Sequence, residues 1–245
     1  MTAVLDHLAI GTRALAGGWD LFSGVLGGTW AYGGEAAGFW WGQVEFAAGP
    51  NIELLTPTAD PAGAFLARFL AARGAGPHHL CFLVADIAGT LARIRAAGIE
   101  PVAVNLASPG WQEAFLHPRD AHGIVIQVAQ QAGPPPPCAP PAQLPEPGPA
   151  ARFDLIEHRV SDLDGAVRLF GDILGGRPDG TGAGTAELTW PGGKRIRLVR
   201  QDDLPHGGAV HHLRFTRAAR AFTAQDCQRA GLLASRLGVR VELAS

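Results

Sequence analysis

The sequence lacks several features that would place it in a common class. None of its 245 residues falls in an apolar run of 18 or more, so no membrane span is expected. The opening stretch MTAVLDHLAIG has no basic segment followed by a long apolar one, which predicts no signal peptide. The net charge of −2 gives no electrostatic footprint for nucleic acid. There are three widely spaced cysteines, Cys81, Cys138 and Cys227, which argues against a disulfide framework and favours a reducing cytoplasm.

What is present is typical of a globular protein of two domains. Apolar residues make up 47% of the chain and charged residues 17%, which predicts a well-buried core. Nine of the 19 prolines fall within residues 133–151, where they cannot donate to a sheet or helix. We therefore expect a domain at 1–130, a semi-rigid proline-rich linker at 131–151 and a second domain at 152–245.

The two predicted domains repeat each other. LFSGVLGG (21–28) returns as LFGDILGG (169–176), and HHLCF (78–82) returns as HHLRF (211–215). Each unit begins with a strand, continues with an amphipathic helix such as residues 86–98, and ends in shorter strands. The fourth unit stops two strands earlier than the second, so we expect it to be truncated.

Polar residues stand alone on one face of several apolar strands. Side chains alternate between faces, so His79 lies opposite Leu80 and Phe82, whereas His78 shares their face. The same alternation isolates His7, Glu53 and Gln127 on their strands. Each of these residues taken alone could face solvent, and each histidine could be buried and satisfied by backbone. Together, two imidazoles, a carboxylate and an amide oxygen make a suitable nitrogen and oxygen site for a divalent ion.

The runs IELLTP (52–57), GPHHLCFLVADI (76–87) and AFLHPRDAHGIVIQV (114–128) resemble the vicinal-oxygen-chelate superfamily of glyoxalases, epimerases, extradiol dioxygenases and bleomycin-resistance proteins. Within it, the likeness is greatest to methylmalonyl-CoA epimerase-like members. The resemblance implies an α+β fold in which paired βαβββ modules form curved mixed sheets. It covers 1–130 strongly and 152–245 weakly, which implies two tandem domains with a degenerate, truncated second one.

The resemblance also implies a metal centre. Its four ligands fall on His7, Glu53, His79 and Gln127, around a divalent ion that could be Zn, Ni, Co, Fe, Mn or Mg. Glu45 falls where epimerases of the superfamily carry a proton-abstracting glutamate. The fourth ligand is usually glutamate, so Gln127 departs from the pattern and leaves Glu53 as the one carboxylate in the set.

The surroundings of this site bear on its ligand. Residues 1–130 contain six arginines and no lysine against ten acidic residues, a balance of −4, which does not favour a polyanion such as coenzyme A. Four aromatic residues gather around the second strand, and they either pack in the core or form an apolar wall for a ligand. They are Trp30, Phe39, Trp40 and Trp41.

The second half has lost the ligand pattern. On the alignment of repeats, Leu155 stands in the place of His7 and Arg197 in the place of Glu53, while His212 matches His79. We expect the strand that would carry the fourth ligand to be missing and His212 to be an inherited strand residue. An arginine in the set repels a cation, so no metal is expected there.

Three functions remain open. The first is a metal-dependent lyase, isomerase or epimerase that acts on a carbonyl-containing small molecule through an enolate-like intermediate, with Glu45 as base. The second is a binding or drug-resistance protein of the same fold that does not turn over its ligand. An extradiol-type dioxygenase, with iron on His7, His79 and Glu53, is the third and least favoured. The predicted partner is a small molecule, and a second copy of the chain could cover the open sheet edge in a homodimer.

Overall fold

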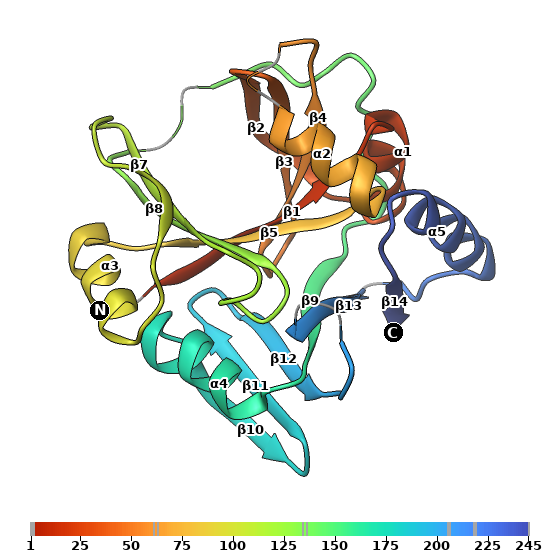
Figure 1. The fold of residues 1–245 in the computed structure, drawn as a ribbon. Coiled ribbons are helices and arrows are strands. Elements are labelled where there is room, and N and C mark those ends of the chain that lie inside the picture. Colours follow the sequence, from red (N-terminus) through yellow and green to blue (C-terminus); the bar gives the residue numbers. More distant parts are fainter. Residues whose placement is uncertain are drawn as a thin grey trace. The chain divides into compact units, whose positions relative to one another are not determined.

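The structure is a computed structural model that describes residues 3–60, 62, 64–133, 135, 137–204, 207–217 and 220–244. Its elements up to residue 131 form two successive βαβββ modules, joined by one extra helix (Figure 1). In chain order they are β1 (Val4–Gly11), α1 (Leu15–Trp19), the π-helical turn η1 (Asp20–Val25), β2 (Thr29–Ala36), β3 (Phe39–Glu45), β4 (Asn51–Pro57), α2 (Ala64–Arg73), β5 (Gly76–Leu83), α3 (Ile87–Ala96), β6 (Val102–Asn105), β7 (Trp111–Leu116) and β8 (Val125–Gln131).

The second half repeats the module once in full and once in part. Its elements are β9 (Arg152–Val160), α4 (Leu163–Val167), the π-helical turn η3 (Arg168–Ile173), β10 (Arg177–Gly182), β11 (Thr185–Trp190), β12 (Lys194–Arg200), β13 (Gly208–Thr216), α5 (Ala224–Arg236) and β14 (Val241–Ala244). None of the helices in the described part of the chain is long and apolar enough to cross a membrane.

Each half contributes one mixed sheet. The first has the order β2-β3-β4-β1-β5-β8-β7-β6, and the second has the order β10-β11-β12-β9-β13-β14. Strands β5 and β8 pair in parallel, as do β12 and β9, whereas the hairpins within each module pair antiparallel. The α+β fold of paired modules with curved mixed sheets, predicted from the sequence, is confirmed.

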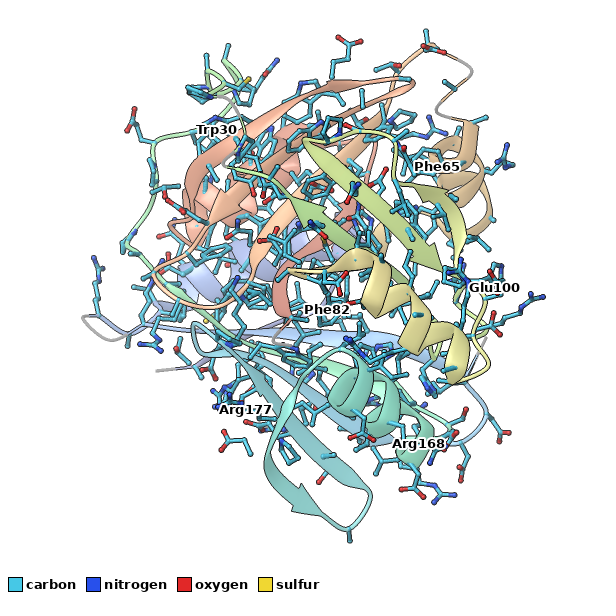
Figure 2. All side chains as sticks on the ribbon, turned by 90° about the vertical axis from the view of Figure 1, so that its left-hand side faces the viewer. Trp30, Phe65, Phe82, Glu100, Arg168 and Arg177 are labelled. Carbon is cyan, nitrogen blue, oxygen red and sulfur yellow. The ribbon has the colours of Figure 1, made fainter. Side chains whose placement is uncertain are left out.

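Contacts divide the chain into two compact units whose boundaries cut strands β1, β5, β9 and β13. One unit comprises Met1–His7, His79–Pro134 and Leu155–His211, and the other Leu8–His78, Pro135–Asp154 and His212–Ser245. In the first unit, Phe82, which is labelled in Figure 2, packs against Phe170 and Trp190 at ring-centre separations of 6.2 and 5.5 Å. In the second, Phe215 stacks on Phe153 at 4.7 Å. Each unit thus combines segments from both halves around its own aromatic core.

The helix expected at 86–98 is confirmed as α3, Ile87–Ala96. Asp86 caps it by accepting a hydrogen bond from the Gly89 N–H, which satisfies one of the free donors of the first turn. Beyond the helix, Gly98 has φ of +82°, a left-handed conformation that glycine adopts without steric cost.

The fourth-ligand strand of the second half, expected to be missing, has a replacement. Strand β14 pairs in parallel with β13 and sets Glu242 opposite Arg214, just as β8 sets Gln127 opposite Cys81. In the first sheet, β8 of the β7–β8 hairpin lies beside β5, and β6, the strand that follows helix α3, lies at the edge of the sheet. Among the described residues of the second half no such hairpin pairs with β13, and β14 satisfies the backbone groups of that edge. Glu242 therefore stands in the position equivalent to Gln127.

Arg217 is a buried cation that fastens three segments of one unit. Its guanidinium donates to the carbonyls of Val25 and Pro149 and to the Asp226 carboxylate, the last at 3.1 Å, and lies 4.0 Å from the Phe222 ring centre. Only 2% of the side chain is exposed. A planar group with five donors suits this arrangement, which ties the end of the proline-rich segment to η1 and α5.

We expect Arg217→Met to lower the free energy of unfolding by about 2–4 kcal/mol, because it removes the donors to the Val25 and Pro149 carbonyls and the cationic partner of Asp226. Urea denaturation at pH 7.5 measures the change. Arg229→Met is the matched control, since Arg229 is 57% exposed and lies 4.0 Å from Asp20, and it should change stability by less than about 0.5 kcal/mol. Equal effects of the two substitutions would show that Arg217 does not hold these segments.

His158 is a fully buried imidazole on β9. Its Nε2 donates to the carbonyl of His122 over 2.8 Å, and its ring packs on Phe170. No described residue bonds its Nδ1. Burial lowers the pKa of His158 to about 4. The hydrogen bond to the His122 carbonyl acts to raise this pKa, and the charge of His122 acts to lower it further. The folded protein therefore holds this residue neutral.

Acid should weaken the fold through His158. Above an unfolded-state pKa of 6.5 both states are neutral at this residue. As the pH falls from 6.5 to about 4, the unfolded state takes up the proton first and stability declines by about 3 kcal/mol. We expect His158→Leu to remove this slope, measured as the free energy of unfolding against pH. An unchanged slope in the variant would contradict the assignment.

Candidate metal centre

Two histidines meet on neighbouring strands of the first sheet. His7 on β1 and His79 on β5 are 3% and 6% exposed, and their Nε2 atoms lie 3.3 Å apart. Alternation along each strand turns both rings to the same face. Two nitrogens bound to adjacent positions of one ion would lie about 3 Å apart for metal–nitrogen bonds of about 2.1 Å. The pair therefore already has the separation of two ligands of one metal.

Asp6 orients the first of these rings. Its Oδ2 accepts a hydrogen bond of 2.8 Å from Nδ1 of His7, so the Nε2 of His7 carries the lone pair that faces His79. Burial acts to raise the pKa of Asp6, but the hydrogen bond from His7 and the electrostatic interactions with His7 and Lys194 outweigh it, and the pKa is lowered. Asp6 is thus an anion that fixes the tautomer of a candidate ligand.

Glu53 supplies the carboxylate. It lies on β4, which neighbours β1 in the sheet, and is 7% exposed. Gln43 on β3 donates from Nε2 to Glu53 Oε2 over 2.9 Å and accepts from Asn51 at 3.2 Å. One ligand atom each from His7, Glu53 and His79 can be chosen so that all lie within 4.8 Å of one another.

Gln127 completes the predicted set from β8. It pairs with Cys81, two positions beyond His79 on the same face of β5, and is 7% exposed. Its Nε2 donates to Glu113 Oε2 over 2.7 Å, while no described residue donates to its buried Oε1. An orphaned buried oxygen costs about 1–3 kcal/mol, a cost that a cation would relieve. The donor set therefore fits a divalent ion held by two nitrogens and two oxygens.

The two histidines of the HHL motif have different roles. His78 turns away from the pair and packs its ring edge-on against Phe69 at 4.9 Å and tilted on Phe65 at 5.8 Å. Burial, assisted by the charge of Arg73, lowers the pKa of His78 to about 4. It is a neutral packing residue beside helix α2, as the alternation predicts.

Glu45 lies at the rim. Strand β3 ends at Glu45, and four residues later Gly49 turns the chain with φ of +102°, so close to the Phe153 carbonyl that no side chain would fit. Glu45 is exposed and shares a face with Gln43, two positions along β3. The structure brings it to the same face as the ligands without burying it.

The four aromatic residues separate onto the two faces of β2 and β3. Phe39 and Trp41 share the face of Gln43 and pack on Ala9, Leu55 and helix α2. Trp30 and Trp40 stack with their ring centres 6.2 Å apart, and each meets buried Trp19 edge-on. Only the first pair therefore lies on the ligand side of its strand.

Sequence reasoning missed the residues that support the ligands. Asp6, Gln43 and Glu113 each bond a candidate ligand from a neighbouring position, and Lys194 contributes its charge from the second half. Burial lowers the pKa of Lys194, opposed by the negative charges of Asp6 and Cys81. Asp6 could have been noticed as the neighbour of His7, but Gln43 and Glu113 meet their partners only through sheet pairing.

A second histidine and carboxylate group lies on the second sheet. Glu157, His211 and His212 also bring one ligand atom each within 4.8 Å. However, Arg159 Nε lies 3.2 Å from Glu157, and Arg214 Nε lies 3.7 Å from Glu242, which itself pairs with His212 at 3.0 Å. Both carboxylates already have guanidinium partners, so this group is an ion-pair network with an unfavourable field for a cation.

Loss of a residue that supports a metal ligand weakens metal affinity by roughly 10–100-fold. We expect His79→Ala to weaken divalent-metal affinity by more than this, because it removes a ligand itself. Calorimetric titration of chelator-treated protein with Co²⁺ or Zn²⁺ measures the affinity. His78→Leu is the matched control and should bind metal as the wild type does. Loss of binding in both variants would point to a folding defect rather than a ligand.

Comparisons with known proteins agree with this architecture. Residues 6–139 match the Glyoxalase/Bleomycin resistance protein/Dioxygenase superfamily. The ethylmalonyl-CoA/methylmalonyl-CoA epimerase of Cereibacter sphaeroides is 34% identical over 87 residues, which are 33% of this chain and 63% of that enzyme. The chain thus spans less than two thirds of the length of this curated relative.

Two solved structures are similar to this chain. The methylmalonyl-CoA epimerase of Mycobacterium tuberculosis, 24% identical, covers 53% of this chain and 89% of its own, with a TM-score of 0.47. A xylose isomerase-like TIM barrel/4-hydroxyphenylpyruvate dioxygenase fusion protein, 17% identical, covers 94% of this chain and 38% of its own, with a TM-score of 0.60. The latter shares the fold over both halves. With more than half of its length matched, this chain belongs to the glyoxalase/bleomycin resistance protein/dioxygenase superfamily.

Proposed function

We propose that this protein is a divalent-metal-dependent epimerase or isomerase that moves a proton at the carbon next to a carbonyl. The observation that carries the proposal is the buried group of His7, Glu53 and His79, together with the orphaned Oε1 of Gln127. When bound, a divalent ion would act as a Lewis acid on the substrate carbonyl oxygen.

Different residues would hold the metal ion and orient its ligands. His7, His79, Glu53 and Gln127 hold the ion, and Asp6 and Gln43 keep two of these ligands in place. Since Glu53 is the one carboxylate among the four ligands, the set and a divalent ion carry a net charge of +1. This charge favours an enolate-like form of the substrate over its neutral form.

Glu45 is the proposed general base. It shares the ligand face of β3, and its exposure leaves the carboxylate open to an entering substrate. Phe39 and Trp41 lie on the same face and would line the apolar side of the substrate pocket. Trp30 and Trp40, stacked on each other and edge-on to Trp19, would support this wall from the opposite face of the sheet.

The substrate class follows from the relative. An ethylmalonyl-CoA/methylmalonyl-CoA epimerase acts on branched dicarboxylic acid thioesters, as its name states. We propose a small acid or thioester with one acidic hydrogen beside the carbonyl. In this proposal residues 1–130 form the domain with the site, 131–151 the linker and 152–245 a second, degenerate domain. The second half has a charge balance of +2 and would supply the basic groups that a CoA ester needs.

Proton exchange tests the reaction. Metal-loaded protein in D₂O should exchange the hydrogen beside the carbonyl of methylmalonyl-CoA or ethylmalonyl-CoA and interconvert the two epimers, as followed by NMR and chiral analysis. Glu45→Gln should reduce kcat by about 10²–10⁴-fold, because general-base catalysis contributes that much. Metal affinity should stay unchanged in this variant.

The controls separate metal from base. Chelator treatment should abolish exchange, and added divalent ion should restore it. Glu35→Gln is the matched carboxylate control, since Glu35 is an exposed residue of β2, and it should leave kcat unaltered. If the metal-loaded wild type exchanges no hydrogen in any thioester or 2-oxo acid offered, the protein is not an enzyme of this kind.

A further inference from the structure

An amide at a metal site has a problem that a carboxylate does not have. Only the oxygen of a glutamine side chain can bind a cation, and the NH₂ group at the other end of the amide would repel it. The two ends differ by a rotation about the last side-chain bond, which by itself is nearly free. A glutamine ligand therefore needs a neighbour that decides which end faces the metal.

We infer that Glu113 is this neighbour: it is a positioning residue that fixes the Gln127 amide with its oxygen toward the metal. The inference rests on the proposed metal site. Glu113 lies on β7, the antiparallel partner of β8, one diagonal step from Gln127. Its Oε2 accepts from Gln127 Nε2 over 2.7 Å, the short distance of a charge-assisted bond.

Glu113 is itself held in place. The same Oε2 accepts a hydrogen bond of 2.8 Å from the indole Nε1 of Trp111, two residues earlier on β7. An ionised carboxylate only accepts hydrogen bonds, so it selects the NH₂ end of the amide and turns Oε1 away. That oxygen is buried and receives no hydrogen bond from the described residues.

The arrangement links two residue identities. With glutamate at position 127, two carboxylates would meet at a hydrogen-bond distance with no hydrogen between them and would repel each other. With glutamine at position 113, either end of the Gln127 amide could be accommodated, and its orientation would be lost. Glutamate at 113 thus suits glutamine at 127, and glutamine at 113 suits glutamate at 127.

A double-mutant cycle tests this coupling. Co²⁺ affinity, from its visible absorption spectrum and from calorimetry, is measured for the wild type, Glu113→Gln, Gln127→Glu and the double variant. We expect Glu113→Gln to weaken binding about 10–100-fold when residue 127 is Gln. The same substitution should strengthen binding when residue 127 is Glu, because it relieves the repulsion between carboxylates. This reversal of sign is the decisive result.

The outcomes separate the two proposals. Thermal melts of the metal-free variants monitor folding. Trp111→Phe should also weaken Co²⁺ binding, but by a smaller factor than Glu113→Gln does. If Glu113→Gln has the same effect whether residue 127 is Gln or Glu, or has none, the positioning role is wrong while the metal site stands. If the wild type binds no Co²⁺ and matches His79→Ala, the metal site and the positioning role both fail.

Discussion

The site depends on two imidazole nitrogens that the sheet holds 3.3 Å apart in a dry interior. Each histidine sits on a central strand with hydrogen-bonded neighbours on both sides, so neither ring can move without displacing a strand. Lone pairs at this separation repel unless a proton or a metal ion lies between them. The backbone therefore fixes the geometry of the centre, and the surrounding side chains fix its charge and its proton positions.

The supporting residues share a principle. Asp6 sets the tautomer of His7, Gln43 holds one oxygen of Glu53, and Glu113 selects one end of the Gln127 amide. Each supporting group pairs with one ligand and removes one degree of freedom from it. Gln127 is neutral where a glutamate ligand would be negative. Glu113 supplies a negative charge one strand further from the ligands. The second sheet shows the opposite arrangement, in which arginines form ion pairs with the carboxylates, and their positive charge disfavours a bound cation.

Much of the first half could be predicted from its sequence. The alternation of apolar and polar residues separated His79 from His78 and isolated His7, Glu53 and Gln127, and the structure puts His7, Glu53 and His79 together. Such patterns work because the period of a strand is local and a buried face tolerates few polar residues. The sequence did not predict the π-helical turns or the end of β3 at Glu45, because both depend on the packing of the turn that follows them.

The sequence by itself determined the repeated modules, the proline-rich segment and which side chains share a face of each strand. Only the tertiary structure decided which strands are neighbours, and with that the partners of the ligands. The sequence prediction left the fourth-ligand place of the second half without a strand, whereas β14 pairs with β13 there, because strand order is set by backbone pairing at the sheet edge. Gln43 and Glu113 were missed for the same reason, since a partner across a sheet is adjacent in space through register and not through sequence.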